Sequence, residues 1–286
     1  MPGINTNLAA NSAVRYINYN SLNQQKYLQQ LSSGLRVNKA SDDAAALSIA
    51  TRIRSDGVAL SQTAINAANA QAVLATAEGG LQQIAAVLSR MKAVTAAAQS
   101  GSLSAADYTN LNKEYQALFL EITAIATSTK FNGVALLDGT GAAGTFSNTG
   151  GANVLLGIVT TDSINISISG AGANNNATAA SLAVASTAIT SSGIAATNQG
   201  TIDTAINTVA GFIASVGAAS SRVGFRASQI AVSKENADAS VSALLDADIA
   251  AAQAAYVSAD VLTQSGIAAL QKANTIPQEI LRLLQS

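Results

Sequence analysis

Apolar residues recur every three or four positions over most of the chain, the spacing of a helix face that packs against another helix. The longest such pattern predicts a continuous helix over residues 44–99, with only Asp56 and Thr63 out of register. A second begins after Ser104, a good N-cap residue, and a third covers residues 202–244. We assign to the seam of these rods the large apolar residues Ile49, Ile53, Leu60, Leu74, Leu81, Ile84, Leu88, Ile213, Val216, Val223 and Ile230.

The middle of the chain, residues 131–200, has a different pattern. It contains the turn-like stretches "FNG" and "LDG", and its alternating "DSINISIS" predicts a strand. Long helices therefore precede and follow a short β-rich part, so the chain leaves along one rod and returns along another. The predicted fold is mainly α, a long antiparallel coiled-coil helical bundle with a small β-rich middle segment.

The stretch "LSSGLRVNKASDDAAALSIA", residues 31–50, separates the first helix from the long one. Gly34 and Asn38 interrupt the first helix. Ser41 is expected to cap the next one, with two acidic residues in its first turn, where the helix dipole favours negative charge. A hinge or spoke between two helices fits this pattern, and so does an ordinary interhelical loop. The residues assigned to the spoke are Gly34, Arg36, Asn38, Ser41, Asp42 and Asp43.

Composition excludes most catalytic chemistry. The chain has no histidine and no cysteine, so it lacks a Ser/His/Asp triad, a Cys/His pair, the usual zinc ligands and a thiol redox centre. The stretch "GTGAAG", residues 139–144, matches a dinucleotide-binding pattern, but the sequence after it does not favour the helix that such a site needs. We therefore expect a loop there, no enzymatic activity, no cofactor and no metal.

Charge and hydropathy limit the partners. The 15 basic and 16 acidic residues leave a net charge of −1, which gives no electrostatic footprint for nucleic acid. No continuous apolar run approaches the ~20 residues that span a bilayer, so we expect no membrane partner. The start of the chain has neither the basic segment nor the apolar core of a secretory signal peptide.

Charged residues make up only 11% of the chain, against about 25% in ordinary soluble domains. The seams are rich in alanine, and an alanine side chain buries little area to offset the entropy of ordering it. We infer that the terminal helices fold fully only against other copies of the chain. If one surface of each copy meets a different surface of the next, the product is an open helical filament.

Long motifs occur in one order at both ends of the chain. They are "INTNLAAN" near the start, "LQQLSSGLRVNKASDDAAALSIA" at 28–50, "AINAANAQAVLATAEGGLQQI" at 64–84, "TKFNGVALLDG" at 129–139, "VGAASSRV" at 216–223 and "VLTQSGIAALQKANTIPQEILRLL" at 261–284. Together they resemble bacterial flagellin, the filament subunit of the flagellum.

The resemblance implies a secreted, extracellular subunit that self-assembles into the flagellar filament for motility, without large outer domains. The implied domains are 1–40 (N-terminal inner-core helix and spoke), 41–130 (rod helices), 131–200 (variable middle segment), 201–242 (C-terminal rod helix) and 243–286 (C-terminal inner-core helix). The first and last would pair as a coil that lines an export channel. The apolar residues assigned to inner-core assembly are Ile4, Leu8, Leu28, Leu31, Leu35, Leu262, Ile267, Leu270, Ile280 and Leu284.

The resemblance also implies partners: further copies of the chain, the flagellar type III export apparatus and its chaperone, the distal cap and the hook-junction proteins. Arg90 and Lys92 match the basic part of the family's immune-receptor motif, but Ala93 and Val94 stand where that motif has Glu and Leu. Two alternatives stay open, a hook-filament junction protein and a secreted coiled-coil protein. A flagellin-like metallopeptidase is excluded because its zinc motif needs histidine.

Overall fold

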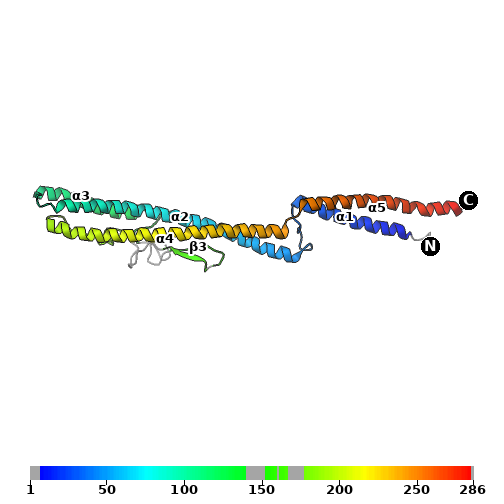
Figure 1. Cartoon of the computed structure of the whole chain (residues 1–286), viewed down its shortest axis with the longest axis horizontal. Helices are drawn as coiled ribbons and strands as arrows, with labels where there is room; N and C mark the ends of the chain where they lie inside the picture. Colours follow the sequence, from blue (N-terminus) through cyan, green and yellow to red (C-terminus); the bar gives the residue numbers. More distant parts are fainter. Residues whose placement is uncertain (1–6, 140–151, 160, 167–176, 285–286) are drawn as a thin grey trace. The chain divides into compact units, whose positions relative to one another are not determined.

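The computed structural model describes residues 7–139, 152–159, 161–166 and 177–284, with side chains as far as residue 275. The chain divides into two compact units. Unit 1 comprises Met1–Gly57 with Glu235–Ser286, and unit 2 comprises Val58–Lys234. The helices and strands of the described residues are α1 (Leu8–Ser33), α2 (Ala44–Ala98), α3 (Ala105–Ser128), β1 (Lys130–Phe131), β2 (Val134–Ala135), β3 (Ala152–Leu155), β4 (Ser163–Ile166), α4 (Ser192–Leu245) and α5 (Ile249–Leu284) (Figure 1).

In unit 1, α1 and α5 lie side by side and run antiparallel (Figure 1). Asn7 caps the start of α1 by accepting a hydrogen bond from the Ala10 amide at 3.0 Å. The Asn7 side chain also donates to the carbonyl of Ala273 at 2.8 Å. Helix α1 ends at Gly34, which has a φ of 72° and closes the last turn as a left-handed C-cap. As predicted, this glycine interrupts the first helix.

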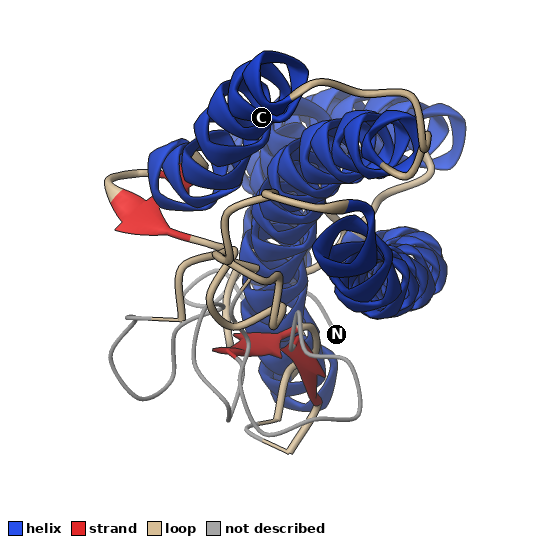
Figure 2. Ribbon diagram, turned by 90° about the vertical axis from the view of Figure 1, so that its left-hand side faces the viewer, coloured by secondary structure: helices blue, strands red, loops and turns tan. Residues whose placement is uncertain are grey.

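Unit 2 is built around the parts of α2 and α4 that it contains, together with α3. The large residues of the α2 seam, among them Leu81, Ile84 and Leu88, have no exposed surface. Ser104 caps α3 and forms a reciprocal capping box with Asp107, as its position predicts. Figure 2 shows the strands of this unit beside the helices rather than between them. Most of the core comes from helix packing, as the seam pattern predicts, and residues such as Leu137, Ile164 and Ile166 of the middle segment complete it.

Two short hairpins follow α3. Strands β1 and β2 pair antiparallel across the two-residue turn of Asn132 and Gly133, whose φ values of 49° and 80° both lie in the left-handed region. Such a turn matches the twist of the strands that it joins and favours an Asn-Gly pair. Strand β4, which pairs with β3, confirms the strand that the alternating pattern predicts. Most of the expected loop at 139–144 lies outside the described residues.

Residues 185–189, here called the strap, run without regular structure just before α4. Side chains from α3 and α4 form hydrogen bonds with the backbone groups of the strap, as a neighbouring strand would in a sheet. The hydrogen bonds are Tyr115 hydroxyl to Ala185 carbonyl at 2.7 Å, Gln116 amide to Ser186 carbonyl at 3.1 Å, Asn198 amide to Thr187 carbonyl at 2.9 Å, Ile189 N–H to Asn112 side-chain oxygen at 3.0 Å and Ala185 N–H to Thr201 hydroxyl at 3.3 Å.

The seam differs from the prediction at one residue. Ile49 is 51% exposed, whereas Ala46 and Ala50 are buried. Ile49 and Ala50 both lie three or four positions from Ala46 and from the half-buried Ile53, so the spacing alone allows either residue. The structure buries Ala50 and leaves Ile49 exposed, so the assignment of Ile49 to the seam was wrong.

Helix α4 is the one described helix that is long and apolar enough, by length and composition, to cross a membrane. This differs from the expectation that no segment approaches such a span, because the expectation rested on continuous apolar runs. The apolar residues Ile202, Val209 and Val216 of α4 have no exposed surface in unit 2. A core helix passes the same test, and the absence of a membrane partner stays a prediction.

Candidate assembly surfaces

The pairing of α1 with α5 rests on small residues. Ala252, Ala259, Gly266 and Ala273 follow one another at intervals of seven, and the three alanines are buried. The approach is closest at Gly266, where an added Cβ would lie 2.8 Å from Cγ1 of Ile17. A stripe with this spacing lets two helix backbones come close together. Most of the larger apolar side chains of α5 lie on other faces, whereas Tyr256 and Leu270 are half-buried.

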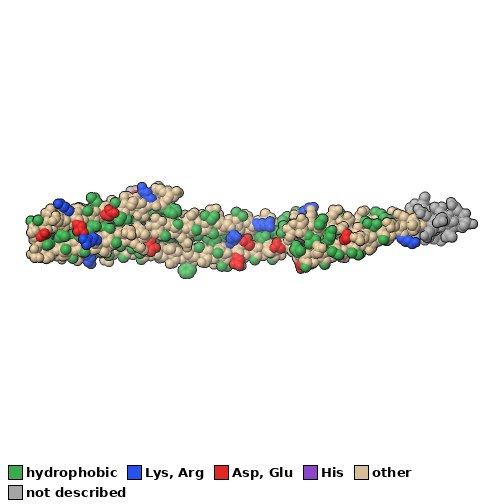
Figure 3. Space-filling view, turned by 90° about the horizontal axis from the view of Figure 1, so that it is seen from above, with side chains coloured by type: hydrophobic (Ala, Val, Ile, Leu, Met, Phe, Trp, Pro, Cys, Tyr) green, Lys and Arg blue, Asp and Glu red, His purple; other side chains and the backbone are tan. Residues whose placement is uncertain are grey.

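Many large apolar side chains of both helices are exposed. Leu22 of α1 has 65% and Leu262 of α5 has 52% of its surface in solvent. Few charges interrupt this surface: Arg15 and Lys26 are the charged residues of α1, and Asp260 and Lys272 those of α5 as far as residue 275. Blue and red side chains are sparse on the visible face of this unit in Figure 3. A soluble monomer rarely leaves so much apolar surface open. The other large apolar residues exposed on these helices are Leu8, Val14, Tyr16, Tyr19, Leu28, Ile249, Val257, Val261 and Ile267.

The predicted spoke pairs with the junction between α4 and α5. We call residues 34–36 and 245–247 the clasp. Leu35 and Asp246 form an antiparallel bridge, the Arg36 N–H donates to the Leu245 carbonyl at 2.6 Å, and the Ala247 N–H donates to the Gly34 carbonyl at 2.9 Å. The Arg36 guanidinium donates to the carbonyl of Leu244 at 2.7 Å and so bonds the end of α4.

Ser41 was expected to cap α2, but it does not. The helix begins at Ala44, and Asp43 is its N-cap, with the side chain accepting from the Ala46 amide at 2.9 Å. Asp42 accepts from the amides of Asn38 and Lys39 at 3.2 and 3.0 Å. These two backbone hydrogen bonds lower the pKa of Asp42, because they favour its ionised form. The two carboxylates hence hold the turn and the cap, and neither lies inside the first helical turn.

Ion pairs connect α2 to the neighbouring helices of unit 2. Arg90 of α2 pairs with Glu114 of α3 at 2.5 Å, and Lys92 of α2 pairs with Asp203 of α4 at 2.6 Å. All four side chains are well exposed, so each pair contributes little to stability. Arg90 and Lys92 are the residues that resemble part of the immune-receptor motif, and their role in recognition stays a prediction.

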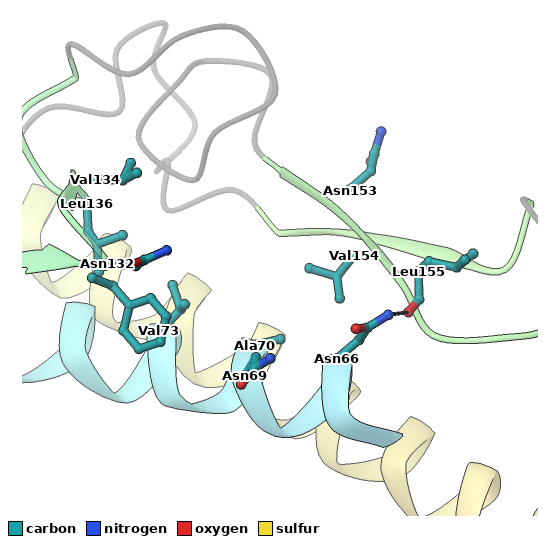
Figure 4. Close-up of a pocket in the computed structure, with 11 residues that line it drawn as sticks. Asn66, Asn69, Ala70, Val73, Asn132, Val134, Leu136, Asn153, Val154 and Leu155 are labelled. Atoms are coloured by element: carbon teal, nitrogen blue, oxygen red, sulfur yellow. Dashed lines mark hydrogen bonds between the residues drawn. The ribbon is translucent and has the colours of Figure 1, made fainter. Parts of the chain in front are cut away.

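A groove opens in unit 2 between α2 and the two hairpins (Figure 4). Its volume is about 560 Å³. Apolar side chains make its floor and four asparagines stand around it, none of its lining residues being charged. Asn66 donates to the carbonyl of Leu155 at 3.4 Å, which links the helix to β3 (Figure 4). The floor residues are Ala70, Val73, Leu136 and Val154, and the rim asparagines are Asn66, Asn69, Asn132 and Asn153.

Both ends of the chain match known families. The family model of the bacterial flagellin N-terminal helical region matches residues 4–142, and that of the bacterial flagellin C-terminal helical region matches residues 200–284. The chain is 32% identical to flagellin FlaB1 of Treponema pallidum (strain Nichols) over 295 residues, covering 99% of both proteins. The chain belongs to the bacterial flagellin family. Flagellin of Bacillus subtilis (strain 168) is also 32% identical, over 302 residues and 99% of both chains.

Another relative, the flagellar filament 33 kDa core protein of Treponema phagedenis, is 32% identical over 288 residues, covering 99% of both chains. These matches identify this flagellin as a structural subunit of the flagellar filament, secreted and located in the extracellular filament. They confirm the family and the function that the terminal motifs imply.

The residues assigned to inner-core assembly fall into three groups. Leu8, Leu28, Leu262 and Ile267 are exposed, whereas Leu31, Leu35 and Leu270 are half-buried. Ile4 lies outside the described residues, and Ile280 and Leu284 lie in α5 beyond the described side chains. Sequence analysis missed the clasp, the strap and the groove of this flagellin. The small-residue stripe of α5 is present in the sequence as Ala and Gly at intervals of seven, but the inner-core assignment selected the larger apolar residues beside it.

Proposed function

We propose that this flagellin polymerises through the exposed apolar faces of α1 and α5, which pack against the same helices of neighbouring copies. The observation that carries this proposal is the stripe of small residues by which α5 packs on α1, together with the exposure of most large apolar residues of both helices. In an ordinary two-helix pair the large residues would face the partner helix. Burying a Leu or Ile side chain contributes about 1.5–3 kcal/mol, so assembly supplies energy that the single chain leaves unused.

The domain assignment follows from the same proposal. Residues 1–40 and 243–286 would form the inner coil, and residues 41–130 and 201–242 the rods around it. The middle segment, 131–200, would add small hairpins to the rod. This division is supported by the family matches at both ends of the chain, which leave residues 143–199 unmatched by either family model.

The partners in the cell include the flagellar type III export apparatus, its chaperone, the distal cap and the hook-junction proteins. This proposal is supported by the surface chemistry of the chain as well as by its family. Exposed leucines and tyrosines on α1 and α5 need cover before assembly, and a chaperone can supply it. The chain acts without catalysis in this proposal, which is supported by the lack of histidine and cysteine in the sequence.

Seeded polymerisation followed by negative-stain electron microscopy tests the proposal. Leu262→Asp places a charge on an exposed position, so the monomer should keep its helix content by circular dichroism while elongation stops. Leu262→Met is the matched control, because it keeps an apolar side chain of similar size and should elongate normally. Normal filaments from Leu262→Asp would show that this face of α5 is not an assembly surface.

The same micrographs separate the alternatives. A hook-filament junction protein would give short rings, and a secreted coiled-coil protein would stay monomeric. Hydrogen exchange on the monomer adds a second criterion. Strong protection of residues 7–35 and 250–284 at high dilution would mean that these helices are complete without other copies.

A further inference from the structure

Among the described residues of unit 2, the most exposed large apolar residue is an aromatic one. Phe225 of α4 has 78% of its surface in solvent. It follows the fully buried Val223 by two residues, and at about 100° per residue its side chain points away from the core. Arg222 and Arg226, both exposed, are three positions before it and one position after it on the helix. An exposed phenylalanine with two exposed arginines close to it in the helix has the composition of an interface hot spot.

The groove between α2 and the hairpins has complementary chemistry. Its floor is apolar and its rim carries four asparagines. An asparagine side-chain oxygen accepts hydrogen bonds, and a guanidinium group donates up to five. The oxygens of Asn66 and Asn153 already accept from Gln62 and Asn165, so Asn69 and Asn132 are the rim acceptors for a guanidinium group. A phenyl ring could enter the groove while guanidinium groups beside it reach the rim. No charged side chain lines the groove, so nothing there repels an arginine.

Phe225 and the groove lie at one level along unit 2. A Cβ added to Gly224 would stand 3.7 Å from the Gln71 side chain, so α4 near Phe225 passes α2 near the groove. Phe225 is not among the residues that line its own groove. Each copy thus carries a projecting group and a different receiving surface at the same level. A contact between two different surfaces repeats from copy to copy without closing on itself, as a filament requires.

We propose that Phe225 of one copy inserts into the groove of a neighbouring copy, with Arg222 and Arg226 donating to the amide oxygens of the rim. A second copy is the fitting occupant because the chain is a filament subunit, and the proposal rests on that function. One aromatic side chain buries about 150–250 Å², far below the ~1,200 Å² of a stable interface. The contact therefore forms in the polymer and does not hold two free copies together.

Chemical crosslinking tests the contact directly, since the chain has no cysteine of its own. Two single variants are prepared, Phe225→Cys and Asn69→Cys, and a short bis-maleimide linker is added to three kinds of filament. Covalent dimers are expected in filaments grown from the equimolar mixture and not in filaments of either variant alone. The control mixture of Phe225→Cys with Ala97→Cys, an exposed residue outside the groove, should give none. The unpolymerised mixture should give none either.

Other results would overturn the proposal. Dimers from Phe225→Cys filaments alone would show that two copies of this residue meet each other. Mixed filaments without dimers would show that Phe225 of a neighbouring copy does not occupy the groove. In both cases visible filaments would leave the filament function intact. If a cysteine variant does not polymerise, it is doped sparsely into wild-type filaments together with the other variant.

The energetic test uses the critical concentration for seeded growth. Phe225→Ala should raise it about 10- to 100-fold, because the full burial of one phenyl group is lost. Val232→Ala, exposed one heptad later on the same helix, is the matched control and should change it no more than a few-fold. An unchanged critical concentration for Phe225→Ala would contradict the proposal.

Discussion

The hydrogen bond between Tyr115 and the strap gives a sharp test of how unit 2 is held together. Tyr115 is fully buried in α3, and its hydroxyl donates to the Ala185 carbonyl at 2.7 Å. Tyr115→Phe removes only the hydroxyl oxygen and keeps the ring that packs in the core. The change therefore isolates one hydrogen bond to a segment that has no strand beside it.

The expected magnitude follows from what the carbonyl loses. A net intramolecular hydrogen bond contributes about 0.5–1.5 kcal/mol, and a buried acceptor left without a partner costs about 1–3 kcal/mol. The Ala185 residue is only half-buried, so water can replace part of the lost bond. We expect Tyr115→Phe to lower the free energy of unfolding by about 1–2 kcal/mol. For a domain of this size that corresponds to a fall in Tm of about 2–8 °C.

Thermal unfolding of the monomer, followed by circular dichroism at 222 nm, measures the difference. Tyr19→Phe is the matched control, because Tyr19 of α1 is 62% exposed. The control should change the free energy of unfolding by less than about 0.5 kcal/mol. Equal Tm values for the wild type and Tyr115→Phe would refute the view that the hydroxyl fastens the strap. Hydrogen exchange of residues 185–189 would locate the effect, with faster exchange expected in the variant.

Three further predictions concern single positions. Burial raises the pKa of Tyr115 to about 12, so the folded chain holds this proton more tightly than the unfolded chain. The contribution of the proton to stability is therefore lost between about pH 10 and 12. The free energy of unfolding should fall more steeply with pH in this range for the wild type than for Tyr115→Phe. Gly266→Ala should destabilise the α1 and α5 pair by about 1–3 kcal/mol, because the added methyl group would overlap Ile17. Gly79→Ala, with open space around its Cα, should stabilise α2 by about 0.5–1 kcal/mol. Amide hydrogen exchange in α5 and in α2 measures the two changes in stability. Asp43→Ala should cost about 1 kcal/mol as the loss of an N-cap and Ser41→Ala almost nothing in urea unfolding, and the reverse order would contradict the assigned cap.

Helical periodicity predicted most of the fold because it is a local signal. The start of α3 at Ser104, the end of α1 at Gly34 and the Asn-Gly hairpin turn each depend on a few adjacent residues. Backbone geometry allows few side chains at such places, so the residue type identifies the conformation. The strand over 163–166 was found in the same way, from alternation alone.

The features that sequence analysis missed depend on residues far apart in the chain. The clasp joins residues 34–36 to residues 245–247 through backbone groups, and backbone groups leave no trace in residue type. The strap resembles any loop until Tyr115 is seen to bond it. Ile49 shows a related limit, since a hydrophobic residue at the edge of the register looks like a seam residue until its exposure is known.

The placement of small and large residues in α5 links the monomer to the filament. If Ala252, Ala259 and Ala273 were leucines, the α1 and α5 pair could bury enough area to be stable in the free chain, but its backbones would stand further apart. With alanines and Gly266 in the stripe, the free pair gains little from burial, and the large residues outside are available for neighbours. Under the proposed function, export of an unfolded chain needs terminal helices that open easily, whereas a filament needs helices that stay closed. A seam of small residues would satisfy both requirements, because in this proposal the missing stability is supplied when other copies cover Leu262 and the side chains around it.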